Sequence, residues 1–208
     1  MNHHIQHPVI DDRMTRLRQR DCSTSEFRRY VQEIAQLMVP SVTANLHTLP
    51  VEVETPLAIT TGRKLDREIV LVPILRAGLG MLEGFLRLLP EASVAHIGMA
   101  RNEDTLQPES YYFNAPPSIQ KADVIILDPM LATGGSASAT ITELKKHGAK
   151  HIYFACLVAA PEGLQTLNLN HPDVPVYYPA LDQRLNKNGY IVPGLGDAGD
   201  RIFGTPPS

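Results

Sequence analysis

The stretch VIILDPMLATGGS, residues 124–136, joins an acidic side chain to a small polar turn, a combination that can bind a phosphorylated sugar. Its first four residues are apolar and predict a buried strand, which Asp128 follows directly. The turn Thr133 to Ser136 supplies two hydroxyl donors and two glycines through which the backbone can approach an anion. A helix beginning there would add roughly half a positive charge from its dipole. The stretch therefore predicts a cup for a terminal phosphate, with Asp128 accepting from sugar hydroxyls.

Two better-known nucleotide motifs are missing from this stretch. No lysine follows the glycines, as it would in a Walker loop, and the G-x-G-x-x-G fingerprint of dinucleotide-binding proteins is absent. The predicted phosphate cup therefore implies neither ATP nor NAD. The alternative interpretation is an ordinary strand-to-helix turn with a surface aspartate.

Two arginines follow predicted strands and could bind further phosphate. Arg76 comes after the apolar run Ile69 to Ile74, and Arg101 comes after the run Val94 to Met99. Ligands in open α/β sheets bind at the carboxyl ends of strands, and a guanidinium fork matches phosphate oxygens. Gly78 would let backbone amides approach the same oxygens. The alternative for either arginine is a solvated surface charge.

The block GYIVPGLGDAGDRIFGT, residues 189–205, contains too many glycines and prolines for a helix. We expect a taut loop that exposes its own amides and carbonyls as hydrogen-bonding groups. The alternative is a C-terminal loop that binds nothing.

Two histidine pairs have the spacing of metal ligands on a helix. His3 and His7 lie in an N-terminus that we expect to be mobile, and Gly148 is expected to end a helix between His147 and His151. Solvated histidines are therefore the interpretation for both pairs, and no metal site is predicted from them.

The pattern of apolar segments predicts the elements that hold these residues. Strands expected at 69–74, 94–99, 124–127 and 152–158 alternate with helical segments, which is typical of a parallel α/β sheet. A first amphipathic helix begins at the capping box Ser23 and Glu26 and runs toward Pro40. The polar, proline-containing segment 101–120 suggests a lid or hood.

Composition limits the class of protein. The 208 residues predict one domain over 1–208, and 19 basic against 22 acidic residues give no footprint of a nucleic-acid binder. Cys22 and Cys156 are interpreted as free thiols, which favours a reducing, cytoplasmic compartment. Neither a signal peptide nor a stretch of ~18 apolar residues is visible, so we expect a soluble protein and no membrane partner.

The strand, acid and small turn together resemble the phosphoribosyl pyrophosphate (PRPP) motif of type I phosphoribosyltransferases. Most members have two acids before the turn, whereas Pro129 stands in the second position here. Asp-Pro followed by MLATGGS is typical of the uracil-specific branch. The similarity extends to VPILRAGLGM (72–81), ARNEDTLQPESYY (100–112), LVAAPEG (157–163) and the C-terminal block. The chain is identified as a member of this branch.

The resemblance implies a fold and an activity. The fold is a central parallel sheet flanked by helices, with a hood and flexible loop at about 101–120 and a uracil-binding loop at about 189–205. The activity is conversion of uracil and PRPP to UMP and diphosphate in pyrimidine salvage, a pentosyl transfer. Two alternatives remain: the same chemistry on a purine or orotate, and an RNA-binding regulator built on this fold.

The resemblance also implies roles for individual residues. Asp128, Arg101 and Asp197 are implied as catalytic residues. Those implied to bind PRPP are Arg76, Ala77, Gly78, Arg101, Asp128, Pro129, Met130, Leu131, Ala132, Thr133, Gly134, Gly135, Ser136 and Asp197. Those implied to bind uracil are Tyr190, Ile191, Gly196, Asp197 and Ala198, mostly through backbone groups.

Cofactor and partners follow from the same resemblance. Mg²⁺ is expected to arrive largely on PRPP oxygens, and no residue is assigned as its ligand. A GTP effector and a homo-oligomer, a dimer or tetramer, are further expectations. No nucleic-acid partner is expected.

Overall fold

The computed structural model describes the backbone of residues 1–101 and 108–206, and side chains outside 99–111 within those ranges. Its centre is a parallel sheet of six strands in the order β1-β12-β10-β8-β4-β5. These strands are β1 (Asn2–His4), β12 (Val176–Tyr178), β10 (His151–Ala155), β8 (Asp123–Leu127), β4 (Ile69–Pro73) and β5 (Ser93–Val94). The predicted parallel α/β sheet is confirmed.

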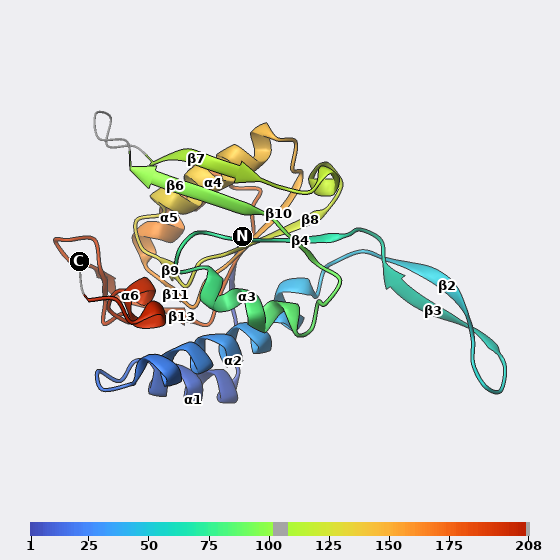
Figure 1. The fold of residues 1–208 in the computed structure, drawn as a ribbon, viewed down its shortest axis with the longest axis horizontal. Coiled ribbons are helices and arrows are strands. Elements are labelled where there is room, and N and C mark those ends of the chain that lie inside the picture. Colours follow the sequence, from blue (N-terminus) through green and yellow to red (C-terminus); the bar gives the residue numbers. More distant parts are fainter. Residues whose placement is uncertain (102–107, 207–208) are drawn as a thin grey trace.

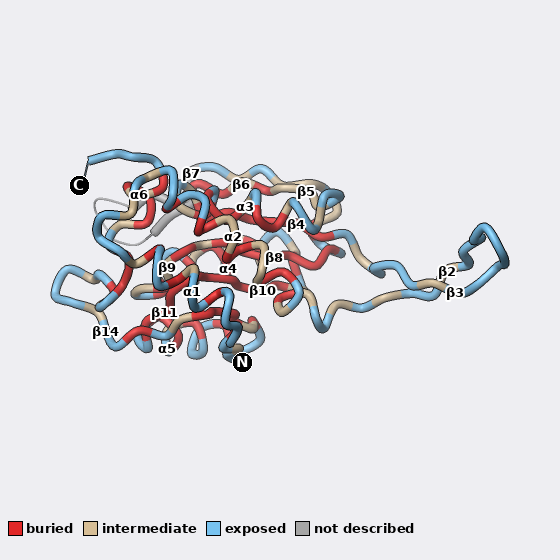
Figure 2. Tube along the Cα trace, turned by 90° about the horizontal axis from the view of Figure 1, so that it is seen from below, coloured by how far each residue is buried: buried red, intermediate tan, exposed pale blue. Residues whose placement is uncertain are grey.

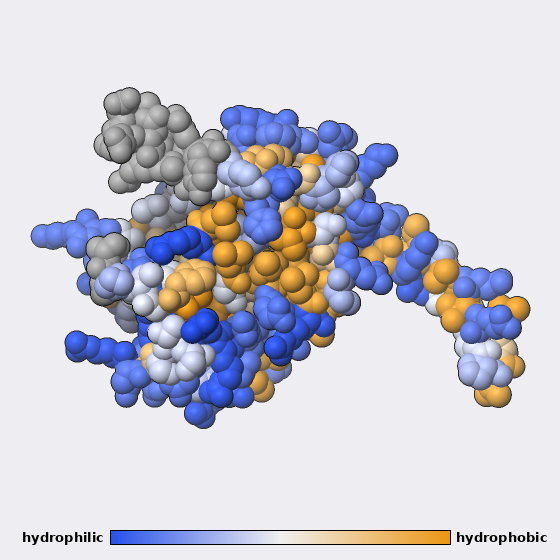
Figure 3. Space-filling view, in the orientation of Figure 1, coloured by the Kyte–Doolittle hydropathy of each residue, from blue (hydrophilic) through white to orange (hydrophobic). Residues whose placement is uncertain are grey.

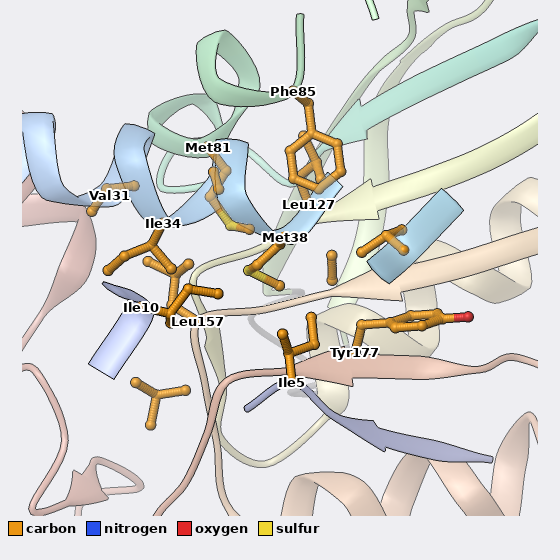
Figure 4. Packing of buried hydrophobic residues seen from close by; sticks show 14 of the residues in the cluster. Ile5, Ile10, Val31, Ile34, Met38, Met81, Phe85, Leu127, Leu157 and Tyr177 are labelled. Carbon is orange, nitrogen blue, oxygen red and sulfur yellow. The ribbon is translucent and has the colours of Figure 1, made fainter. Parts of the chain in front are cut away.

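Helices cover both faces of this sheet (Figure 1). One face carries α1 (Pro8–Leu17), α2 (Thr24–Thr43) and α3 (Leu79–Leu86), and the other carries α4 (Gly135–Lys146) and α5 (Pro161–Asn170). The central strands β4 and β8 are buried along their whole length, so both faces are apolar and successive side chains enter different cores. Figure 4 shows the core between the sheet and the helices α1, α2 and α3. In it Ile34 and Met38 of α2 lie near Leu127 of β8 and Leu157.

The helix α2 begins as predicted but ends later. Ser23 and Glu26 form the reciprocal capping box. The helix reaches Pro40 as expected and continues through it to Thr43. Val39 and Val42 are buried on either side of the proline, and their burial stabilises a last turn that Pro40 alone would disfavour.

The N-terminus is ordered, contrary to the expectation of a mobile segment. β1 pairs in parallel with β12, and the His3 ring stacks on Tyr177 with centroids 4.6 Å apart. His7 instead caps α1 by accepting a hydrogen bond from the Val9 amide. The two histidines therefore make separate structural contacts, where solvated side chains were expected.

The strand expected over 94–99 is divided between two sheets. β5 extends the main sheet, whereas β6 (His96–Arg101) pairs antiparallel with β7 (Pro108–Asn114), with a register shift at Gly98 and Met99. A 3₁₀ turn, Pro117–Gln120, follows. The predicted hood segment 101–120 therefore contains β7 and this turn, and its residues 102–107 lie outside the described residues.

A long antiparallel hairpin extends from the body and was not predicted (Figures 1 and 2). It consists of β2 (Thr48–Glu54) and β3 (Ile59–Leu65), paired over their full length. Figure 2 shows it as exposed or half-buried throughout. Nothing in the hairpin packs into the two cores, so burial patterning gave no sign of it.

The remaining elements lie beside the carboxyl ends of the main strands. A small sheet joins β9 (Met130–Leu131), β11 (Val158–Ala159) and β13 (Ala180–Leu181), and β14 (Arg184–Leu185) pairs with β15 (Ile191–Val192). The chain ends in the short helix α6 (Ala198–Phe203). None of the helices in the described part of the chain has the length and apolar character of a membrane span.

Candidate active site

Three segments far apart in the sequence meet in one pocket of about 230 Å³. They are the loop between β4 and α3, the loop between β8 and α4, and the C-terminal block. The pocket is lined by Ala77, Asp128, Met130, Ala132, Gly189, Tyr190, Ile191, Gly196, Asp197, Ala198 and Gly199. The first two loops leave neighbouring parallel strands, which explains why they lie at the same edge of the sheet.

The predicted phosphate turn adopts the conformation that its glycines allow. Gly134 has φ 81°, in the left-handed region, and stands at the N-terminus of α4. A Cβ at Gly134 would lie 2.9 Å from Cβ of Thr166 and 3.1 Å from the carbonyl oxygen of Gly163. The helix α5 therefore packs directly against this turn.

Asp128 is half-buried at the end of β8. Its Oδ1 accepts a hydrogen bond from the Met130 amide at 3.3 Å. Burial raises the pKa of Asp128 to about 7, against the smaller opposing effect of that hydrogen bond. Burial likewise raises the pKa of the neighbouring Cys156 thiol. Asp128 can therefore change protonation near neutral pH while it lines the pocket.

The loop between β4 and α3 is held tightly against the end of β8. A Cβ at Gly78 would lie 2.3 Å from the carbonyl oxygen of Leu127, and the Gly78 amide donates to the carbonyl oxygen of Ile74 at 2.8 Å. The glycine thus serves close packing, and its amide is already engaged. The Arg76 side chain is 64% exposed and lies 3.6 Å from Asp200 Oδ1.

The C-terminal block is partly helical, so the expectation of a loop throughout is wrong. Asp197 caps α6 by accepting from the Asp200 amide at 2.9 Å, and Gly204 ends the helix with φ 70°. Before this helix the block contains the two-residue strand β15, and the loops on either side of it have positive φ at Gly189, Gly194 and Gly196. The glycines therefore lie mostly before and after the helix, where they do not oppose it.

Two charged residues that hold this loop were not singled out from the sequence. Arg18 donates to Asp182 Oδ1 at 2.7 Å and to the carbonyl oxygen of Gly194 at 3.0 Å, and Asp182 Oδ2 accepts from the Gly194 amide at 2.7 Å. Asp182 is buried. The ion pair joins residues 164 positions apart, so no local spacing could reveal it.

The structure brings many of the predicted residues together and separates others. The predicted residues that line the pocket are Ala77, Asp128, Met130, Ala132, Tyr190, Ile191, Gly196, Asp197 and Ala198. Leu131 is buried in the core, and the carbonyl oxygen of Pro129 accepts from the amides of Leu157 and Val158. The turn Thr133 to Ser136 adjoins the pocket along the chain but is not part of its lining. The Arg101 side chain lies outside the described residues.

The pocket offers few protein ligands for a cation. No group of three or more histidine, cysteine or acidic side chains that could hold a metal occurs among the described residues. Two carboxylates, Asp128 and Asp197, line the same pocket. This donor set fits Mg²⁺ bound mainly by ligand oxygens and water, since Mg²⁺ commonly uses only one or two protein carboxylates.

Comparisons with known proteins agree on one family. The family model described as uracil phosphoribosyltransferase matches residues 4–205. A uracil phosphoribosyltransferase of Dictyoglomus thermophilum is 53% identical over 202 residues, covering 97% of this chain and 98% of that protein. One of Ligilactobacillus salivarius is also 53% identical over 202 residues, covering 97% of each chain.

Solved structures agree on the fold. A protein of Aquifex aeolicus superposes with a TM-score of 0.91 and 38% identity, covering 98% of each chain. A hypoxanthine-guanine phosphoribosyltransferase of Bacillus anthracis has a TM-score of 0.53 and 14% identity, covering 76% of this chain and 80% of that one, which shows the fold alone. The parallel sheet with its flanking helices is therefore the type I phosphoribosyltransferase fold, and the chain belongs to the uracil phosphoribosyltransferase family.

Proposed function

We propose that this chain transfers the phosphoribosyl group of PRPP to uracil, releasing diphosphate and forming UMP. The observation that carries the proposal is the single pocket in which Asp128, beside the phosphate turn, faces the loop that contains Ile191 and Gly196. Conversion of labelled uracil to UMP, dependent on PRPP, is the direct test. No UMP at any pH, with or without Mg²⁺, would reject the activity.

The proposed reaction is displacement of pyrophosphate from the anomeric carbon by N1 of uracil. Asp128 accepts from the ribose hydroxyls and, when ionised, stabilises the cationic sugar of the transition state. The turn Thr133 to Ser136 binds the 5′-phosphate through backbone amides and hydroxyls. Arg76 and Arg101 bind the departing pyrophosphate. Mg²⁺ would supply further neutralisation of that pyrophosphate, and its removal by a chelator should abolish turnover.

The base specificity rests on backbone groups. Uracil presents an edge of acceptor, donor and acceptor, which Ile191, Gly196 and Ala198 can match without side-chain rotation. Tyr190, 40% exposed, borders the same pocket. Purines and orotate are the competing bases within this chemistry. A panel of bases at saturating PRPP distinguishes them, and preference for any of these over uracil would overturn this assignment.

A homo-oligomer is the proposed assembly, and the hairpin β2–β3 supports it. Apolar side chains alternate with polar ones along the hairpin (Figure 3), and Leu57 and Ile59 near its tip are 97% and 66% exposed. Such exposure is typical of a surface that packs against another chain. Light scattering of Leu57→Asp with Ile59→Asp should give a smaller species than the parent. Leu169→Asp, which places the same charge at an exposed site on α5, is the matched control.

We also propose activation by GTP and a cytoplasmic location, and an RNA-binding regulator is the alternative function. GTP activation should appear as a change in initial rate when GTP is titrated at subsaturating PRPP. The free thiols of Cys22 and Cys156 support a cytoplasmic location. A net charge of −3 does not favour the alternative of an RNA-binding regulator. Salt-dependent RNA binding without turnover would support that alternative.

A further inference from the structure

Asp200 is a buried carboxylate behind the proposed pyrophosphate site, and the family resemblance assigned it no role. It lies in α6 and is 7% exposed. Its Oδ1 accepts from the Thr205 hydroxyl at 2.6 Å and lies 3.6 Å from a terminal nitrogen of Arg76. Its Oδ2 has no hydrogen-bond partner among the described residues. A buried carboxylate is stable only when its acceptors are matched by donors, so this oxygen requires an explanation.

The backbone around Asp200 is fixed. Its amide donates to the capping side chain of Asp197 at 2.9 Å. The helix α6 also packs against the start of α3 and the loop before it: a Cβ at Gly80 of α3 would lie 2.7 Å from Cδ1 of Ile202, and one at Gly199 would lie 3.9 Å from Cβ of Ala77, next to Arg76. The carboxylate therefore has a defined position relative to Arg76.

Arg76 is the cation that can complete the contacts of Asp200. The adjacent Arg201 donates to the carbonyl oxygens of Leu195 and Gln19, and its guanidinium lies over the Phe27 ring at 4.2 Å. Those contacts direct Arg201 elsewhere. The Arg76 guanidinium has five donors in a planar fork, and it can contact a carboxylate on one side while presenting other N–H groups to phosphate.

We propose that Asp200 is a positioning residue for the pyrophosphate-binding Arg76. In the PRPP complex Asp200 accepts from two N–H groups of the guanidinium, through Oδ1 and Oδ2, and the remaining N–H groups bind pyrophosphate. Asp200 lies two residues after Ala198, so the same helix follows the base-reading loop and supports the pyrophosphate arginine. The identity of the substrate in this inference rests on the proposed function.

Asp200→Asn tests the inference because it removes the charge with little change in shape. We expect KM for PRPP to rise about tenfold, the range of one lost charge-assisted contact, while KM for uracil stays within about twofold. Glu83→Gln is the matched control: it breaks the exposed pair of Glu83 with Arg87, 3.5 Å apart on α3, and should leave both KM values unchanged. A general distortion of α6 would instead raise KM for uracil equally, and that result would overturn the inference.

A double-mutant cycle shows whether Asp200 acts through Arg76. Arg76 is mostly exposed, so Arg76→Ala should fold. In that background Asp200→Asn should change PRPP affinity by less than about twofold, and full additivity of the two changes would contradict the inference.

Binding of PRPP without base, measured by calorimetry, provides a readout that does not need turnover. If the parent binds PRPP but converts no uracil, the proposed function fails while the coupling between Asp200 and Arg76 can still be tested. If the parent converts uracil and Asp200→Asn binds PRPP as the parent does, the inference fails alone.

Discussion

Asp128 shows how one residue's surroundings set the pH range of the proposed reaction. Burial raises its pKa to about 7, so the carboxyl is protonated in part of the population at neutral pH. In the proposed reaction the ionised form would accept from two ribose hydroxyls and face a cationic sugar, which the neutral form would do less well. Activity should therefore depend on this single ionisation.

We predict that kcat/KM for PRPP rises with pH through about 7, since kcat/KM reports the free enzyme. Asp128→Asn should lower it about 10- to 150-fold at pH 8, from loss of a charge-assisted contact of ~1.5–3 kcal/mol, and should flatten the rise. If the rise in kcat/KM came from titration of the PRPP phosphates, Asp128→Asn would show the same rise as the parent. The same pH profile in the two enzymes would therefore mean that Asp128 is not the group that titrates.

The ionisation of Asp128 also affects the free energy of unfolding. An acid in an ion pair stabilises the folded state more as pH rises, whereas Asp128, with its raised pKa, should stabilise it less. The folded state retains the proton up to about pH 7, whereas the unfolded state releases it near 3.8. The free energy of unfolding should therefore receive a contribution from Asp128 that is lost as pH rises between these values. Denaturant unfolding of Asp128→Asn and the parent across this interval measures the difference.

The sequence predicts those site residues that lie in one contiguous motif, and it misses those whose partners are distant along the chain. Asp128 and the turn after it follow from one contiguous motif, and the structure places Asp128 in the pocket. Asp200 and Arg18 take part through partners more than a hundred positions away, Arg76 and Asp182. Their contacts exist only after the chain has folded, so spacing along the sequence carries no sign of them.

Among the elements, α5 fixes the position of the loop between β8 and α4, which is proposed to bind phosphate. A Cβ at Gly163 would lie 2.5 Å from the carbonyl oxygen of Ala132 and 2.7 Å from that of Leu131. Both contacts are with backbone, which cannot rotate away. The helix and the loop can approach this closely only because residue 163 is glycine.

We predict that Gly163→Ala displaces this loop and raises KM for PRPP, with a loss of roughly 1–3 kcal/mol in the free energy of unfolding from overpacking. KM for uracil should change less, because the base-reading loop lies on another segment. Steady-state kinetics and denaturant unfolding measure both effects. Leu169→Ala, at an exposed site on the same helix, is the control. An unchanged KM for PRPP would mean that the loop tolerates the shift.

His171 connects α5 to the helix that the phosphate turn begins. Its Nε2 lies 3.0 Å from the carbonyl oxygen of Ser138 in α4, and its Nδ1 lies 3.5 Å from Lys145 Nζ. Burial is the main cause that lowers the pKa of His171, and Lys145 adds to it. Burial and Lys145 therefore favour the neutral ring, against the contact with the Ser138 carbonyl, which acts to raise the pKa of His171.

We predict that the free energy of unfolding falls on acidification below the ordinary histidine pKa of 6.5, because the unfolded state then binds a proton that the folded state does not. The loss should continue until pH reaches the lower pKa of the folded state. His171→Asn should reduce this dependence. His7→Asn keeps a capping side chain at the start of α1 and serves as the control. Equal pH dependence in parent and His171→Asn would contradict the prediction.

Prediction of the elements succeeded where burial sets the pattern. The continuous apolar runs of β4 and β8 identify central strands, and the capping box identifies the start of α2. Three features depend on interactions that compete with local propensity. The end of α2 beyond Pro40 depends on packing, α6 depends on its capping residues, and the hairpin β2–β3 depends on pairing between exposed strands. The sequence left the end of α2 open, spoke against a helix at α6 and gave no sign of the hairpin.

Across the whole molecule, the sheet topology explains why one pocket can contain both substrates. Adjacent parallel strands β4 and β8 deliver the two proposed phosphate-binding loops to one edge. The sequence predicted that each loop follows a strand, but not that the two strands are neighbours. The third segment, the C-terminal loop, reaches that edge because Arg18 of the N-terminal region and Asp182 hold Gly194. The base-reading loop therefore depends on both ends of the chain.

This dependence leads to a prediction about base selection. Cytosine reverses two groups of the uracil edge, at N3 and at position 4, and backbone groups cannot rotate to suit it. Two mismatched buried groups at ~1–3 kcal/mol each should favour uracil about 30-fold to 10⁴-fold in kcat/KM.

Arg18→Gln leaves Asp182 buried without its cation, so the loop around Gly194 should loosen. We expect KM for uracil to rise and the preference over cytosine to fall at least threefold, with KM for PRPP less affected. Arg16→Gln, at an exposed site in the last turn of α1 two residues before Arg18, is the control. A parent preference below about tenfold would mean that the loop does not read the base, and an unchanged preference in Arg18→Gln would mean that the ion pair does not hold it.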